Sequence, residues 1–164
     1  MPTSLENGLR KAAALTFEEL SFMLPTEMLN EHQRAAQAAI AATISFRGAF
    51  GGTLAVLVCG EVLPLLSANM LGEDSPPDQN LQFDALQEIA NVICGNVLPE
   101  LAGSDAVFDI GPAQIMTPKQ ARSCSKLMPA AELHVGLDQG RVELRLYLDD
   151  PNALTGQPPR THGA

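Results

Sequence analysis

The sequence predicts an α/β fold of the α+β, two-layer kind, with long helices packed on one face of a mainly antiparallel sheet. Two observations carry this prediction. Residues 9–24 and 81–101 place apolar side chains at helical spacing, whereas residues 40–58 and 133–148 each hold two alternating apolar runs joined by a glycine-containing turn. Helices and hairpins that are segregated along a chain usually form a helical layer on an antiparallel sheet.

The first half of the chain contains one long helix, one hairpin and one shorter helix. Helix 9–24 has Leu9 and Leu20 on its apolar face, and a proline follows its end. Residues 26–42 are rich in helix formers but weakly periodic, so a short helix and a mobile connection both stay open. The hairpin follows at 40–58, and helix 61–71 has a proline in its first turn and a glycine just beyond its end.

The second half also combines a long helix with a hairpin, after a short polar linker. Helix 81–101 is the longest in the chain, and short strands are expected at 106–110 and 113–117. Residues 118–129 are predicted to form a loop. The clearest hairpin follows at 133–148, where the alternating runs flank an Asp-Gln-Gly turn.

Length and composition indicate one domain. The chain has 164 residues, of which 46% are apolar and 4% aromatic. We expect a single domain over residues 1–149, with a core of aliphatic side chains and two similar halves near 9–71 and 81–149. Residues 150–164 are polar, contain proline and glycine, and are predicted to be a disordered tail.

The charge of the chain excludes several classes of function. Nineteen acidic against ten basic residues give a net charge of −9, which opposes binding to nucleic acid and to anionic membranes. The longest strongly apolar run, residues 54–59, is far shorter than the ~20 residues of a spanning helix. The first residues lack the apolar region of a signal peptide, so we expect a cytoplasmic protein without membrane insertion.

The cysteines and histidines give no sign of a metal site. Cys59, Cys94 and Cys124 are widely spaced, without a Cys-x2-Cys pair, and the three histidines are far apart in the sequence. We expect reduced cysteines, with Cys59 and Cys94 packed as small apolar residues. Cys124 lies in a polar segment and is expected to react first with a thiol reagent.

A polar stripe on helix 81–101 is the best indication of function. Asp84, Glu88, Asn91 and Gly95 lie within about 60° of one another at 100° per residue. The opposite side of the helix carries Leu86, Ile89, Ile93, Val97 and Leu101. Asparagine and glycine are poor residues for an exposed helix face, so the stripe gives up stability. It is interpreted either as a surface that another molecule approaches closely at Gly95 or as a solvated face with a tolerated glycine.

The pattern Asp84-x3-Glu88-x2-Asn91 resembles the D/S-x3-E-x2-N signature of the CheC/CheX/FliY phosphatases, which act on phosphorylated response regulators of chemotaxis. The runs DALQEIANVICGNVLPELAG, ISFRGAFGGTLAVLV and ANMLGED are similar to the CheX branch, so the resemblance covers residues 9–149. It implies a CheC/CheX-like fold. It also implies one active site, because a second Glu-x2-Asn, at Glu27, has methionine in the first position and a proline within its span.

The resemblance also implies roles for the stripe residues. Asn91 would orient the attacking water, and Glu88 would pair with a lysine of the regulator. Asp84 would support docking or local geometry, beside the space left by Gly95. The partner would be a phosphorylated CheY-like receiver domain that carries Mg²⁺, so the chain needs no cofactor of its own. CheX proteins are homodimers, and the apolar strand at 142–148 is expected to offer an edge for dimerisation.

Two other functions stay open at this point. The first is a non-catalytic CheX-like module that docks on a receiver domain or on the flagellar switch, since folds outlive their activities. The intact pair Glu88 and Asn91 favours the phosphatase over this module. The second is sensing of a small ligand in a cleft, for which the sequence shows no binding set.

Overall fold

An antiparallel sheet organises the computed structural model, which describes residues 3–154. Within these residues the strands are β1 (Ala38–Gly48), β2 (Gly52–Cys59), β3 (Phe108–Ile110), β4 (Gln114–Met116), β5 (Ala131–Leu137) and β6 (Gly140–Leu148). Neighbouring strands follow the order β3-β1-β2-β6-β5, and β4 pairs with β1 beside β3. The two hairpins therefore join through their inner strands, β2 and β6.

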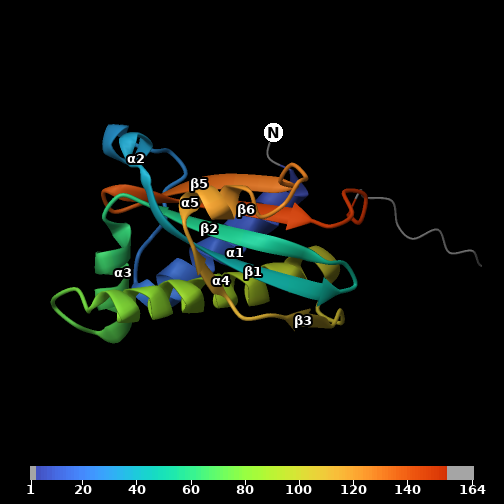
Figure 1. Cartoon of the computed structure of the whole chain (residues 1–164), viewed down its shortest axis with the longest axis horizontal. Helices are drawn as coiled ribbons and strands as arrows, with labels where there is room; N and C mark the ends of the chain where they lie inside the picture. The colour runs from blue at the N-terminus through green and yellow to red at the C-terminus, as the bar shows by residue number, and fades with distance from the viewer. Residues whose placement is uncertain (1–2, 155–164) are drawn as a thin grey trace, which may run out of the picture.

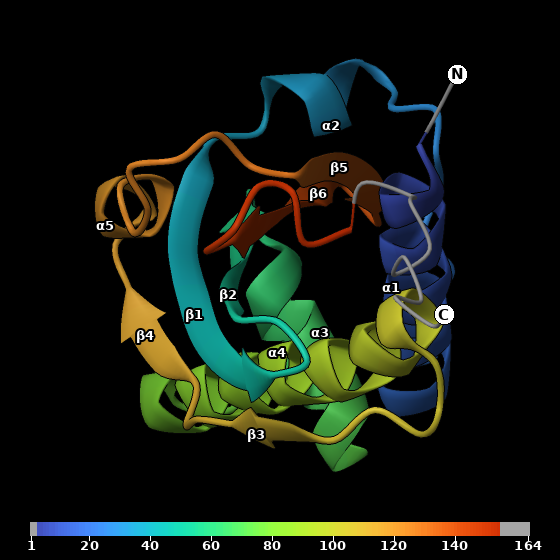
Figure 2. The same ribbon diagram turned by 90° about the vertical axis from the view of Figure 1, so that its right-hand side faces the viewer.

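Most of the helical mass lies on one face of this sheet. The helices are α1 (Ser4–Ser21), α2 (Glu31–Ala35), α3 (Val62–Leu71), α4 (Gln79–Ala102) and α5 (Pro118–Arg122). Figures 1 and 2 show the sheet curving around α1, α3 and α4, with α5 outside β1 and α2 near one end of β5. The predicted fold class is confirmed.

Alternation along the strands builds the core. Leu54, Val56 and Val58 of β2 and Leu144 and Leu146 of β6 are buried in one cluster with the helices. The opposite face of the sheet carries a smaller cluster, in which Ala41, Ala55, Leu57 and Tyr147 pack with Ala121 of α5. Both faces of the sheet are therefore covered at β2 and β6, which are central because each pairs with a strand on either side.

The hairpin predictions are confirmed, but the expected dimerisation edge is wrong. β6 pairs with β2 on one side and with β5 on the other, so its apolar run at 142–148 has no free edge. The run is apolar because it is buried centrally. Alternation identifies the buried face of a strand, but it does not identify the strand's position in the sheet.

Two predictions, the bounds of helix 9–24 and the loop at 118–129, need correction, and one of the two alternatives for residues 26–42 is confirmed. α1 begins at Ser4 rather than Leu9, because the side chains of Thr3 and Glu6 form a capping box. Residues 26–42 contain the five-residue helix α2, capped in the same way by Asn30 and Gln33. The loop expected at 118–129 starts as helix α5, whose capping box joins Thr117 and Gln120.

Two further expectations concern the C-terminal tail and membrane insertion. The predicted tail falls largely on residues 155–164, which lie outside the described residues. Among residues 3–154, no helix combines the length and the apolar character that crossing a membrane requires.

Candidate active site

Helix α4 carries the predicted stripe, and a side-chain cap stabilises its N-terminus. Its N-cap is Asp78, whose Oδ1 accepts a hydrogen bond from the Leu81 backbone N–H at 3.0 Å. The inward side of the helix is buried in the main core through Leu86, Ile89, Ile93 and Val97. This burial fixes which side of α4 faces outward.

The four stripe residues lie on that outward side. Asp84, Glu88, Asn91 and Gly95 are all exposed, as their spacing predicts. The side chains of Asp84, Glu88 and Asn91 make no hydrogen bond or ion pair with another residue in the range 3–154. Their polar atoms are therefore free to bind another molecule.

Gly95 leaves an open space beside Asn91. A Cβ atom built at Gly95 would meet no atom within 4 Å, so packing does not require a glycine here. One turn later, Pro99 lies inside α4 and lacks the N–H that would bond the Gly95 carbonyl. At this point the helix backbone carries no side chain, and the Gly95 carbonyl lacks the N–H that would bond it in a regular helix.

Two side-chain contacts hold α4 on either side of the stripe. Gln87 donates from Nε2 to the carbonyl of Ala113, in the β3–β4 connection, at 2.9 Å. Asn96 donates from Nδ2 to Thr16 Oγ1 of α1 at 3.1 Å. Sequence reasoning did not identify Gln87 and Asn96, because their partners lie 26 and 80 residues away along the chain. These contacts give the stripe a rigid support.

The stripe lies apart from the hollow at the start of α4. A shallow hollow between α3 and the start of α4 is lined by Leu63, Pro64 and Phe83, among others, and by none of the stripe residues. Within residues 3–154, no group of three or more His, Cys, Asp or Glu side chains is arranged to hold a metal ion.

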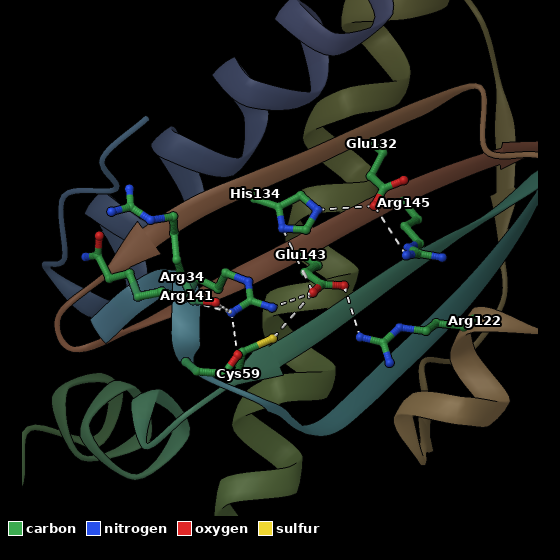
Figure 3. A network of polar contacts seen from close by, with 10 residues as sticks. Arg34, Cys59, Arg122, Glu132, His134, Arg141, Glu143 and Arg145 are labelled. Carbon is green, nitrogen blue, oxygen red and sulfur yellow. Dashed lines mark hydrogen bonds and ion pairs between the residues drawn. The ribbon is translucent and has the colours of Figure 1, made fainter. Parts of the chain in front are cut away.

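A buried carboxylate, Glu143 of β6, forms the main polar network on the other face of the sheet (Figure 3). Only 2% of Glu143 is exposed, and Arg141 Nη2 donates to it at 2.9 Å. Arg122 of α5 reaches it at 3.4 Å, and His134 Nδ1 of β5 lies 3.9 Å away. Burial alone would raise the pKa of Glu143. The Arg141 hydrogen bond and the charges of His134, Arg122 and Arg141 outweigh burial and hold this pKa below its ordinary value.

The cysteines lie where the sequence predicts. Cys59 and Cys94 are buried, and Cys124 is exposed. Burial raises the pKa of Cys94 to about 12. Burial and then the charge of Glu143 raise the pKa of Cys59 to about 11. Neither buried thiol is poised for chemistry.

Comparison with solved structures identifies the fold. The chain is similar to a putative chemotaxis protein from Desulfovibrio vulgaris Hildenborough, with a TM-score of 0.68 and 15% identity over 90% of this chain and 97% of that chain. It is similar to CheX from Vibrio vulnificus, with a TM-score of 0.68 and 14% identity over 90% and 97%. It is also similar to CheX from Borrelia burgdorferi, solved in a complex with CheY, BeF3 and Mg²⁺, with a TM-score of 0.61 and 16% identity over 88% and 97%. The chain therefore has the fold of the CheX-like chemotaxis proteins.

A match to a family model identifies the protein family. The model of the chemotaxis phosphatase CheX matches residues 40–133, which is more than half of the chain and includes the whole stripe. The chain belongs to the CheX family, and the resemblance stated from its sequence is confirmed. A search of curated proteins finds no significant match.

Proposed function

We propose that this protein is a phosphatase that hydrolyses the aspartyl phosphate of a CheY-like response regulator. The observation that carries the proposal is the pair Glu88 and Asn91, which are exposed on one face of α4 without partners among the described residues. Membership of the CheX family supports the reaction class. The similar Borrelia burgdorferi CheX, solved with CheY, supports a receiver domain as the partner.

The reaction requires a positioned water rather than a covalent nucleophile. Water attacks the phosphorus, the bond between phosphorus and the aspartyl oxygen breaks, and inorganic phosphate and a free carboxylate result. In our proposal Asn91 orients this water, because a carboxamide both accepts and donates hydrogen bonds without adding negative charge. A carboxylate in that position would repel the anionic phosphoryl group.

The other stripe residues would dock the regulator. Glu88 lies one turn from Asn91 and would pair with a lysine beside the phosphoryl group. Asp84 would support the docked geometry, and Gly95 would let the regulator's backbone approach the helix. In this proposal the Mg²⁺ belongs to the regulator's own site, and the chain contributes no metal ligand.

Replacing Asn91 tests the chemistry. We expect Asn91→Ala to reduce the accelerated rate about 100-fold or more, because the water loses its orientation. Phosphate release from a phosphorylated receiver domain measures the effect, with circular dichroism confirming the fold. Asn7→Ala, at another exposed asparagine on a helix, is the matched control and should act like the parent. An unimpaired Asn91→Ala variant would reject the mechanism.

Replacing Glu88 tests docking. We expect Glu88→Ala to weaken binding to a receiver domain activated with beryllium fluoride, because an ion pair across the interface is lost. Glu61→Ala is the control, since Glu61 is exposed and caps α3 without a side-chain hydrogen bond. If Glu88→Ala binds as tightly as the parent, this role is wrong. If the parent binds but does not speed phosphate release, the protein is the non-catalytic module.

The homodimer that the CheX resemblance implies is part of the proposal. Since β6 is central, the outer strands of the sheet are β5 on one side and β3 with β4 on the other. Thr26 already pairs with Gly136 of β5, so only part of the β5 edge is available. Light scattering at micromolar concentration tests this state. A monomer there would remove it without affecting the proposed chemistry.

A further inference from the structure

Helix α4 carries a proline in its interior, Pro99, four residues after Gly95. Glycine and proline are the two least favourable residues within a helix. Because residues four apart lie on the same face of a helix, Gly95 and Pro99 lie together on the exposed side of α4, one turn beyond Asn91. The pair removes a side chain and a backbone donor from one place at the end of the stripe.

Neither helix termination nor packing explains this pair. The helix continues past Pro99 to Ala102, and the Gly103 N–H donates to the Pro99 carbonyl at 2.9 Å. By contrast, Pro64 lies in the first turn of α3, where a missing N–H has no helical acceptor to lose. Pro99 is exposed, and a Cβ atom built at Gly95 would meet no atom within 4 Å. The core therefore requires neither residue.

The Gly95 carbonyl is a hydrogen-bond acceptor without its helical donor. In a regular helix it would bond the N–H of residue 99, which proline lacks. It is not one of the last four carbonyls of α4, which would lack a donor in any helix. Since glycine has no side chain, the exposed surface of Gly95 is backbone surface. No side chain of residues 3–154 donates to this carbonyl, and the neighbouring amide of Asn96 donates to Thr16 Oγ1.

This acceptor lies beside the residues of the proposed chemistry. A helix rises about 1.5 Å per residue, which places Gly95 about 6 Å along the axis from Asn91. A protein that docks on Glu88 and Asn91 covers a much larger area than this, so it would cover Gly95 as well. The covered carbonyl loses the water that hydrates it, and an acceptor buried without a donor is unfavourable. The docked protein therefore has to supply a donor.

We propose that the Gly95 carbonyl, left free by Pro99, accepts a hydrogen bond from an N–H group of the docked regulator. This inference rests on the proposed function, because the regulator is the molecule that covers the stripe. A carbonyl oxygen only accepts hydrogen bonds, so the group opposite Gly95 is a backbone amide or the N–H of a side chain. Pro99 acts through Gly95 and is a positioning residue for binding, not a catalytic residue.

Returning the missing donor tests the inference. Pro99→Ala and Pro99→Ser both restore an N–H that bonds the Gly95 carbonyl within the helix. We expect both variants to bind a CheY receiver domain, activated with beryllium fluoride and Mg²⁺, about tenfold more weakly in calorimetric titration, since about one hydrogen bond is lost. Pro64→Ala is the matched control and should bind like the parent, because its new N–H lies in the first turn of α3. High salt should shrink the loss if the donor is a charged side chain and leave it unchanged if the donor is a backbone amide.

Stability and turnover separate this role from a structural one. Both Pro99 variants should melt about 5 °C or more above the parent, because proline is the least favourable residue within a helix. The KM for the phosphorylated receiver domain should rise about tenfold while kcat stays unchanged, since Glu88 and Asn91 are intact. A fall in kcat with an unchanged KM would instead show that Pro99 sets the position of Asn91, and it would count against the inference.

The carbonyl itself gives the most direct measurement. In carbonyl ¹³C NMR of the parent, the Gly95 signal should move when the activated receiver domain binds, because the carbonyl gains a hydrogen bond. In Pro99→Ala it should move less, since the helix already supplies that bond. The inference alone is wrong if the parent speeds phosphate release but the Pro99 variants bind as tightly as the parent, or if the Gly95 signal stays in place. If the parent neither binds the receiver domain nor speeds phosphate release, the proposed function is wrong and the inference falls with it.

Discussion

Single residues on the surface of α4 carry the proposed function, and Gly95 shows how they can be tested apart from stability. Spacing alone left open whether this glycine is tolerated or needed. Because no atom lies within 4 Å of a Cβ built there, packing does not explain it. The open space is compatible both with the approach of another molecule and with a glycine that is tolerated on a solvated face.

We predict opposite effects of Gly95→Ala on folding and on regulator binding. The free energy of unfolding should rise by about 0.8–1.0 kcal/mol, since alanine is the better residue within a helix. Binding to an activated receiver domain should weaken, and Gly95→Gln should weaken it further. Chemical denaturation and a binding titration measure the two quantities. Unchanged binding in both variants would favour the tolerated glycine.

Residue spacing predicted the orientation of Asp84, Glu88 and Asn91, because a helix with one apolar side has only one way to face its core. It did not predict their neighbours. Gln87 and Asn96 look like ordinary surface residues until their partners, Ala113 and Thr16, are brought beside them.

Among the elements, α4 is the one on which the site depends. Its N-cap residue can be replaced to test how much the cap stabilises the helix. Asp78 accepts the Leu81 N–H and so satisfies a helix donor that would otherwise be free. We predict that Asp78→Ala lowers the free energy of unfolding by about 1 kcal/mol. The melting temperature should fall by about 2–4 °C in thermal denaturation. Asp74→Ala, in the linker before the cap, should change little.

The long elements were predictable and the short ones were not. α4 and the hairpins extend over enough residues for a period to be seen. α2 and α5 have five residues each, too few for a repeat, and only their capping boxes at Asn30 and Thr117 give a signal. Gln33 of α2 also depends on tertiary structure, since its Nε2 donates to the Asp138 carbonyl at 3.0 Å.

At the scale of the whole molecule, Glu143 links the sheet to α5 and makes stability depend on pH. The folded state holds the pKa of Glu143 below its ordinary value of 4.5. A carboxylate with a lowered pKa stabilises the fold fully above its unfolded-state value. This contribution is lost as the pH falls below 4.5 and through the folded-state value.

We therefore predict that Glu143→Gln is less stable than the parent at neutral pH and that the difference shrinks in acid. Glutamine keeps the shape of the side chain but leaves Arg141 and Arg122 without their counter-charge. Urea denaturation of both proteins from neutral pH to below 4.5 measures this difference. A gap that stays constant with pH would show that Glu143 contributes through packing alone.

The sequence by itself determined the two-layer class, the long helices and hairpins, the CheX resemblance and the outward face of Glu88 and Asn91. These are local or periodic properties, and each depends on residues a few positions apart. Only the tertiary structure decided that β6 is central and that Glu143 is buried among cations. Strand order, ion pairs and surface exposure depend on contacts between residues far apart in the chain, which local patterns do not encode.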